Sequence, residues 1–242
     1  MGRLLLIRHA QASFFSDNYD QLSEKGFLQA RLLGEHLVGE KRIFDKVYAG
    51  PLLRQFQTLQ TVREVYQEAG LPFPKKESFL AELSEHSGST VMRTLMPQFK
   101  TVDPIFQAFE PEVERAPADQ IKHFLKAFHH FLRIWAKDEL GFPHPANIEN
   151  WKEFRARVDK GMQKMMAENQ AGENIIAFSS AGAVSASVGF ALNMKDQGKV
   201  VELGGQVRNS AITEYVFSGD KINLHAFNRS PHLLSEDLIT HI

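Results

Sequence analysis

An apolar run that ends in an arginine and a histidine constrains this chain most. It reads Leu4-Leu5-Leu6-Ile7-Arg8-His9-Ala10-Gln11. An unbroken apolar run of this length is typical of a strand buried on both faces of a mostly parallel sheet. In such sheets ligands bind just beyond the carboxyl ends of the strands. Arg8 and His9 are therefore predicted at the edge of a site, although the same pattern also suits a surface charge and a histidine that only caps the strand.

Composition bounds the class of protein. The 242 residues are 43% hydrophobic and 24% charged, with a net charge of −1, as expected of an ordinary α/β domain with a sizeable core. The charge gives no reason to expect nucleic acid or a membrane as partner. The absence of cysteine excludes disulfides and a thiol nucleophile. With no apolar run of membrane-span length and no signal-peptide pattern, we expect a cytoplasmic protein.

Hydrophobic periodicity predicts alternating helices and strands along most of the chain. The stretch 91–116 stays unassigned, because four prolines interrupt it or border it. Near the C-terminus, two β-prone runs flank Gly219-Asp220 and predict a hairpin, so the sheet should be mixed. The other predicted elements are a helix capped by Ser23 that ends near Gly39, a strand over 45–50, a helix over 52–70, a helix over 121–135, a helix capped by Asn150, a strand over 174–179 and a helix of small residues after it.

Polar residues follow three of the predicted strands and should meet at one edge of the sheet. Arg8 and His9 follow the first strand, Arg54 lies in the first turn of the helix after the second, and Ser179-Ser180 close the strand over 174–179. Two arginines beside helix N-termini suit a dianion such as a phosphoryl group. A neutral imidazole between them is a nucleophile at pH 7, and the guanidinium groups stabilise the charge that develops on phosphorus oxygens.

An acid that protonates the leaving oxygen would complete this site. Glu82, embedded in the apolar run 79–83, is the candidate. The histidines at 123, 129 and 130 have no carboxylate beside them at ligand spacing, so we expect no metal and no cofactor.

Five segments of the chain resemble motifs of the histidine phosphatase superfamily, also called phosphoglycerate mutase-like. The segments and the family patterns they resemble are 6–11 with L-x-R-H-G-E/Q, 22–30 with L-T/S-x-x-G-x-x-Q-A, 50–58 with S-x-L-x-R-A-x-Q-T, 80–82 with L-x-E, and 228–233 with N-x-x-x-H-L. The resemblance implies a three-layer α/β/α sandwich with a mostly parallel mixed sheet. It implies one domain over 1–242, with 86–150 as a variable helical insertion, or cap, over the site.

The resemblance also implies an activity. It predicts a phosphohydrolase that acts on a small phosphomonoester through a phosphohistidine on His9, with Glu82 as the proton donor and with Arg8 and Arg54 binding the substrate. Phosphoglycerate mutase-type transfer is the first alternative, and a phosphate-binding protein with weakened or lost catalysis is another. The substrate and the oligomeric state stay open.

Two departures from the family patterns concern the site. Ala10 stands where the family has glycine, and Ser180 stands where it has a second histidine. We predict Ser180 in the phosphate pocket, where one neutral hydrogen bond in place of a charged one should cost about 1–2 kcal/mol, or roughly 10–30-fold in rate. His232 folding back into the gap is an alternative. Glu85 is a less favoured rival to Glu82 as the acid. Ser180 as a serine-hydrolase nucleophile is disfavoured, because Ser179 precedes it where a nucleophile elbow needs glycine spacing.

Overall fold

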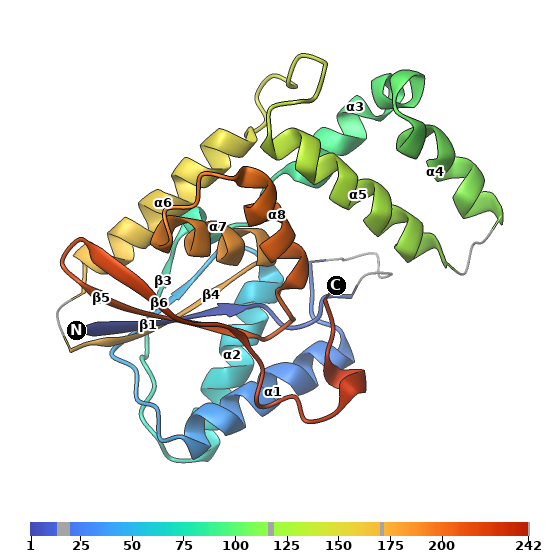
Figure 1. Cartoon of the computed structure of the whole chain (residues 1–242). Coiled ribbons are helices and arrows are strands. Elements are labelled where there is room, and N and C mark those ends of the chain that lie inside the picture. Colours follow the sequence, from blue (N-terminus) through green and yellow to red (C-terminus); the bar gives the residue numbers. More distant parts are fainter. Residues whose placement is uncertain (14–19, 116–118, 170–171, 242) are drawn as a thin grey trace.

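The computed structural model describes residues 1–13, 20–115, 119–169 and 172–241 and has one six-stranded sheet at its centre (Figure 1). The strand order is β3-β2-β4-β1-β5-β6. The first four strands of the chain pair in parallel, whereas β5 runs antiparallel to both β1 and β6. The mixed sheet and its C-terminal hairpin are as predicted. The strands are β1 (Gly2–Arg8), β2 (Lys46–Ala49), β3 (Glu77–Phe79), β4 (Asn174–Ser179), β5 (Ile212–Ser218) and β6 (Lys221–Arg229).

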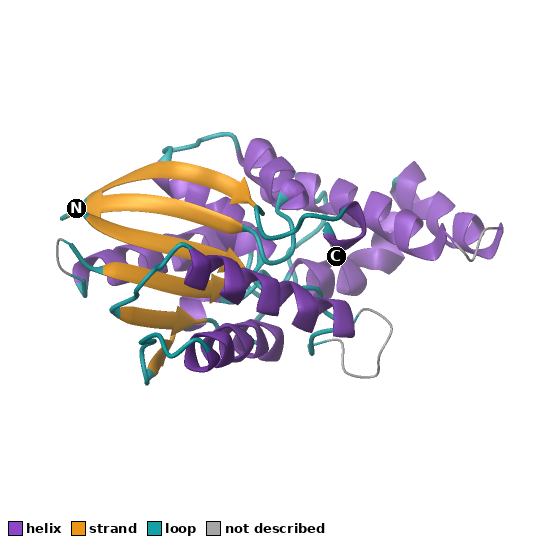
Figure 2. Ribbon diagram, turned by 90° about the horizontal axis from the view of Figure 1, so that it is seen from below, coloured by secondary structure: helices purple, strands orange, loops and turns teal. Residues whose placement is uncertain are grey.

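Helices cover both faces of the sheet, which explains the unbroken apolar run of β1. Leu4 and Leu6 belong to the hydrophobic cluster on one face, and Leu5 and Ile7 to the cluster on the other. Burial on both faces removes the polar-apolar alternation of a half-exposed strand. The three-layer α/β/α prediction is confirmed (Figure 2). One layer holds α1 (Glu24–Gly39) and α2 (Leu53–Glu68), and the other holds α6 (Trp151–Ala167), α7 (Ala181–Ala191) and α8 (Gln197–Gln206).

Two of the predicted helix starts are capped as the sequence indicates. The Ser23 hydroxyl accepts a hydrogen bond from the Gly26 N–H at 3.0 Å and satisfies one of the free donors at the start of α1. At α6 the Asn150 side chain accepts from the Glu153 N–H at 2.9 Å, and Glu153 accepts from the Asn150 N–H at 2.8 Å. These caps fix where both helices begin.

The stretch that the prolines left unassigned is helical. It forms α3 (Gly88–Val102) and α4 (Pro104–Arg115), which with α5 (Gln120–Ala136) make an arm that projects away from the sheet (Figure 1). Pro97 lies inside α3, and Pro104 is the first residue of α4, where a missing N–H costs no helical hydrogen bond. Burial of Val91, Leu95 and Phe99 along one side of α3 outweighs the loss at Pro97. Residues 116–118 of this stretch lie outside the described residues.

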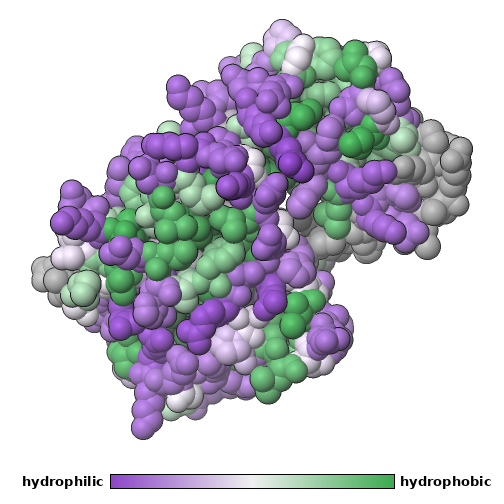
Figure 3. Space-filling model, viewed as in Figure 1, coloured by the Kyte–Doolittle hydropathy of each residue, from purple (hydrophilic) through white to green (hydrophobic). Residues whose placement is uncertain are grey.

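On the face seen in Figure 3, hydrophobic patches on the core and on the arm are bordered by polar side chains. Within the described ranges, none of the helices combines the length and the apolar character needed to cross a bilayer. Short turns of 3-10 helix in the described part of the chain include η1 (Ala81–Leu83), between β3 and α3, and η3 (Glu236–Leu238), near the C-terminus.

Candidate active site

The carboxyl ends of β1, β2 and β4 lie at one edge of the sheet. In the strand register Arg8 pairs with Ser179, and Ala49 pairs with Phe178. A cavity of about 870 Å³, called the His9 cavity below, opens beyond this edge. Arg8, His9 and Arg54 all line it, so the structure brings together three residues that the sequence placed after different strands or at a helix start.

His9 is held as a neutral base with one nitrogen fixed by the backbone. Its Nδ1 lies 2.7 Å from the Ala10 carbonyl oxygen, so Nδ1 must carry the hydrogen. Its Nε2 then has the free lone pair and accepts from Arg54 Nε–H at 3.1 Å. Burial, together with the positive charges of Arg54 and Arg8, holds the pKa of His9 well below its usual value of 6.5. An unprotonated Nε2 at neutral pH is what a nucleophilic imidazole requires.

Arg8 and Arg54 are each held by acceptors on other segments of the chain. Arg54 Nη1 donates to Asp20 Oδ1 at 2.6 Å, and the other oxygen of Asp20 accepts from the Leu53 N–H at 2.9 Å. Arg8 donates to the carbonyl oxygens of Val207 and His241. Sequence reasoning did not single out Asp20. It combines a carboxylate at a helix N-terminus with a guanidinium partner and so orients the first turn of α2.

The two candidate acids occupy different places. Glu82 is not among the residues that line the His9 cavity, and its Cβ lies against Gly161 of α6, where a side-chain carbon would come within 2.6 Å. Glu85 lines the cavity, and its side chain is 23% exposed. The signal was present in the sequence, because residues 83–85 repeat the L-x-E pattern of residues 80–82. Glu82 lies within the η1 turn, whereas Glu85 follows the turn and lines the cavity.

Glu85 is bound by backbone donors on two elements. Its Oε1 accepts from the His86 N–H at 2.9 Å, and its Oε2 accepts from the Gly182 N–H at 3.1 Å. A Cβ at position 182 would lie 2.2 Å from Oε1, so only glycine permits this approach. Burial raises the pKa of Glu85, but the His86 ring, the two N–H donors and Arg54 outweigh it, and the pKa is lowered.

Arg157 of α6 clamps the segment that carries Glu85. Its Nη1 donates to the carbonyl oxygens of Ala81, Glu82 and Ser84 at 3.0–3.2 Å, and Nη2 donates to that of Glu85 at 3.3 Å. Glu149 in turn accepts from Arg157 Nε at 2.6 Å and from Nη2 at 2.9 Å. One guanidinium thereby fixes the backbone on which the carboxylate is mounted.

Ser180 is fully buried and does not line the His9 cavity. Its hydroxyl accepts a hydrogen bond from Gln55 Nε2 at 2.8 Å. Gln55 stands where the family pattern has alanine, and Gly50 stands where it has serine. A Cβ at Gly50 would lie 2.2 Å from Gln55 Oε1. The three departures are therefore one packing solution: a glycine makes room for the glutamine, which reaches the serine.

His232 does not take the place of the second histidine in this structure. Its Nε2 lies 2.8 Å from Ser210 Oγ, its ring stands 6.1 Å from that of His36, and it is absent from the cavity lining. Among the rings that do line the cavity is that of His86, which lies beside Gly182. Its Nδ1 accepts from the Gly88 N–H at 3.2 Å, so Nε2 carries the hydrogen and faces Glu85 Oε1 at 3.6 Å.

The comparisons with known proteins agree with this geometry. The family model of the histidine phosphatase superfamily (branch 1) matches residues 4–85 and 116–230, which is most of the chain. The protein belongs to this superfamily. The matched ranges contain the strand ends and the helix starts that build the His9 cavity, and they leave out most of the arm.

Solved structures of the same fold have diverged far in sequence. A phosphoserine phosphatase mutant from Entamoeba histolytica, bound to phosphoserine, has a TM-score of 0.63 at 19% identity, covering 97% of this chain and 100% of its own. YhfR from Bacillus stearothermophilus gives 0.65 at 16%, covering 96% and 100%. A phosphoglycerate mutase from Bacillus anthracis gives 0.62 at 17%, covering 96% and 94%. At these identities the likeness establishes the fold.

The part of the chain that the structure describes offers no set of side chains that could bind a metal ion. There, no group of three or more histidine and carboxylate side chains is placed to hold an ion. The polar groups of the His9 cavity are instead suited to an anion.

Proposed function

We propose that this protein hydrolyses small phosphomonoesters through a phosphohistidine on His9. The observation that carries the proposal is the neutral Nε2 of His9, which accepts from Arg54 at 3.1 Å in a cavity that Arg8 also lines. An incoming phosphoryl group would take over the Arg54 N–H as its oxygen approaches, which frees the lone pair of Nε2 for attack. Membership of a phosphoryl-transfer superfamily supports the same chemistry.

The reaction we propose has two balanced steps. In the first, Nε2 forms a bond to phosphorus while the bond to the ester oxygen breaks, and that oxygen takes a proton. In the second, water attacks the phosphohistidine, gives up a proton and releases phosphate and the neutral imidazole. We assign both proton transfers to Glu85 in place of Glu82, because Glu85 lines the cavity. A phosphoryl dianion beside Glu85 favours its protonated form, so substrate and proton should enter together.

The arm supports a proposal about the substrate. The wall of the His9 cavity opposite the sheet is formed by apolar side chains of α5 and by the first residue of α6, with Arg93, Lys126 and His129 among them. The apolar residues are Phe124, Leu125, Phe128, Leu132 and Trp151. A cavity of this size and lining suits an ester whose alcohol part is bulky and apolar, because burial of apolar surface would contribute to its binding. Small polar esters should be poorer substrates.

The experiment that tests the function is to trap the intermediate. Wild-type protein is exposed to ³²P-labelled 1-naphthyl phosphate and quenched in alkaline detergent, which preserves phosphohistidine. We expect label on the wild type and on Lys160→Met, a charge control on the exposed side of α6, and none on His9→Ala. Release of naphthol and phosphate in equal amounts supports hydrolysis. Transfer of the label to an added alcohol in preference to water would favour the mutase alternative, and binding without label would favour a phosphate-binding protein.

A further inference from the structure

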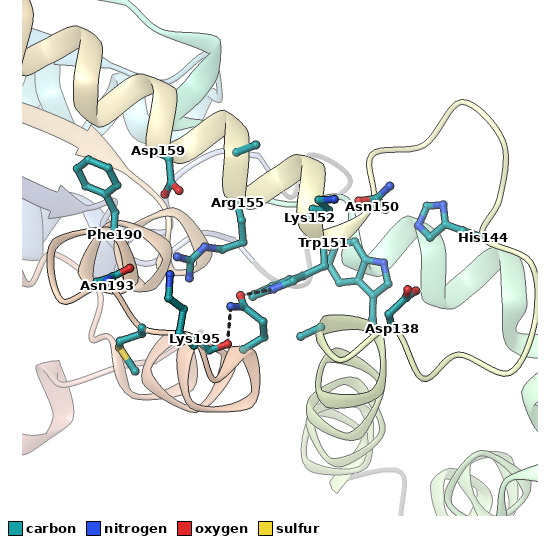
Figure 4. A pocket seen from close by; sticks show the side chains of 16 residues that line it. Asp138, His144, Asn150, Trp151, Lys152, Arg155, Asp159, Phe190, Asn193 and Lys195 are labelled. Carbon is teal, nitrogen blue, oxygen red and sulfur yellow. Dashed lines mark hydrogen bonds between the residues drawn. The ribbon is translucent and has the colours of Figure 1, made fainter.

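A second cavity lies along the first half of α6 and at the C-terminal end of α7, whereas the N-terminal end of α7 borders the His9 cavity. It has a volume of about 650 Å³ and is called the Arg155 cavity below. Side chains from the end of α5, the first half of α6, the end of α7 and the segment before α8 surround it (Figure 4). Trp151 borders both cavities, whereas Arg8, His9 and Arg54 border only the first.

The guanidinium of Arg155 packs against the backbone of α7 at Gly189. Glycine at position 189 permits this close approach, because a Cβ there would lie 2.4 Å from Nη1 and 2.8 Å from Nη2. Arg155 Nε and Nη1 are buried, and no described residue accepts a hydrogen bond from either. Burial lowers the pKa of Arg155, although the group stays charged at neutral pH. A buried guanidinium that lacks an acceptor is costly, so this arrangement favours an anion in the cavity.

Asp159 lies one helical turn beyond Arg155 and presents the opposite charge. An arginine and an aspartate four residues apart on a helix ordinarily pair, yet no ion pair joins these two within the described residues. Asp159 Oδ1 is buried and accepts no hydrogen bond from the described residues, and burial raises the pKa of this carboxyl. Figure 4 shows both side chains projecting from α6 into the same space, with Lys195 pointing toward them from the segment after α7. A cation and an anion thus stand side by side, each in need of a partner.

The remaining walls add a donor and aromatic surface. Trp135 Nε1–H and His144 Nε2 line the cavity and are likewise buried without a partner among the described residues. Trp151 is anchored, since its Nε1–H donates to Gln197 Oε1 at 2.9 Å. Phe190 forms the wall on the α7 side. These rings can cover an apolar group of a ligand whose polar end faces α6.

We propose that the Arg155 cavity binds a small zwitterion, of which a free α-amino acid is the simplest chemical class. Its carboxylate would accept from Arg155, and its ammonium would donate to Asp159. Inorganic phosphate alone would satisfy Arg155 but place a second negative charge against Asp159. A simple amine would do the converse. Only a ligand that carries both charges on neighbouring atoms satisfies both side chains.

The chain carries its own reporter for this test. Its only two tryptophans, Trp135 and Trp151, both line the Arg155 cavity, so intrinsic fluorescence should change when the cavity fills. We would titrate the full-length protein with L-leucine, and separately with sodium acetate, ethylamine and inorganic phosphate at equal ionic strength. We expect saturable binding of L-leucine at least 10-fold tighter than that of acetate or ethylamine. Arg155→Met and Asp159→Asn should each weaken L-leucine binding at least 10-fold, and Lys160→Met should leave it unchanged.

Several outcomes would overturn the proposal. Equal affinities for L-leucine and acetate would make the cavity a plain anion site, and L-leucine binding that survives Arg155→Met would place the ligand elsewhere. Absence of any saturable response would leave only solvent in the cavity. Because Trp151 also borders the His9 cavity, each titration is repeated with His9→Ala, which should keep the L-leucine response and alter only a phosphate response. If either α6 variant is unstable, the urea midpoint of unfolding with and without L-leucine replaces fluorescence, since a ligand raises the midpoint only of a protein that binds it.

Discussion

The His9 cavity and the Arg155 cavity share a wall but treat their charges in opposite ways. In the first, Arg54 is held by Asp20 and by His9, and Glu85 is held by backbone donors. In the second, Arg155 and Asp159 stand close together without pairing. A cavity whose groups are fixed before the ligand arrives is suited to stabilising a transition state, because no reorganisation is needed at the moment of reaction. A cavity whose charges lack partners is suited to binding.

The prediction with the largest expected effect tests whether the His9 cavity, and not the Arg155 cavity, is the reaction centre. His9→Ala should lower phosphatase activity by more than a thousandfold, because the proposed mechanism depends on the unprotonated Nε2 of His9, which accepts a hydrogen bond from Arg54. Activity is measured with 1-naphthyl phosphate, and the urea midpoint checks that the variant is folded. A variant that keeps a tenth of the wild-type rate would show that the first cavity is not the reaction centre.

The prediction with the next largest effect tests whether Glu85 or Glu82 is the proton donor. Glu85→Gln should lower kcat about 100-fold or more for 1-naphthyl or alkyl esters, and far less for p-nitrophenyl phosphate, whose leaving group needs little protonation. Glu82→Gln is the matched control and should stay within about threefold of the wild type for both. Equal losses for the two leaving groups in Glu85→Gln would argue against proton donation. The reverse ranking of the two variants would return the role to Glu82.

A third prediction concerns the buried hydrogen bond between Gln55 and Ser180. Ser180→His should destabilise the protein by about 1–3 kcal/mol, because Gln55 occupies the space that an imidazole needs. Adding Gln55→Ala should recover most of that loss and allow the new histidine to reach the cavity, with a rise in rate. Urea unfolding and steady-state kinetics on the single and double variants give the coupling directly. Additive losses in the double variant would contradict the packing argument.

The prediction with the smallest expected effect concerns His232, a buried histidine that lines neither cavity, and its effect on stability as the pH changes. Burial, with a contribution from His36, lowers the pKa of His232 to about 3, whereas the unfolded chain has about 6.5. Below pH 6.5 the unfolded state therefore binds a proton that the folded state refuses, so stability falls as the pH falls toward 3. Between pH 7 and pH 5 this group should cost about 2 kcal/mol.

His232→Gln tests that value, since an amide keeps a hydrogen bond to Ser210 but does not titrate. Urea unfolding of both proteins at pH 5, 6 and 7 should show a shallower pH dependence in the variant. His9 acts in the same direction, because its pKa is lowered as well, so part of the slope should survive. An unchanged slope would mean that the pKa of His232 is the same in the folded and the unfolded protein.

Much of the fold and part of the site could be predicted from local patterns. Leu4 to Ile7, the cap at Ser23 and the hairpin at Gly219 each encode their structure within a few residues. Arg8, His9 and Arg54 were placed correctly at one edge because parallel strands bring their ends together. Helix α5 of the arm was predicted, whereas α3 and α4 were left unassigned because Pro97 and Pro104 obscure a pattern that tertiary burial restores.

The placement of other side chains depends on contacts between distant segments. Two L-x-E patterns lie three residues apart, and the fold decides that Glu85 lines the His9 cavity and Glu82 does not. The position of Ser180 depends on Gln55, which lies 125 residues earlier in the chain. No window along the sequence contains both residues. The position of Arg155 likewise depends on a distant residue, because its guanidinium packs against Gly189.

The Arg157 clamp has a consequence for the way this protein opens. Residues 81–85 and the second turn of α6 are separated by about seventy residues, yet the Arg157 guanidinium joins them, and Glu149 holds that guanidinium in place. Local opening of either segment must break the same set of hydrogen bonds. The two should therefore exchange their amide hydrogens as one cooperative unit, at a single rate that Arg157→Met would split into two.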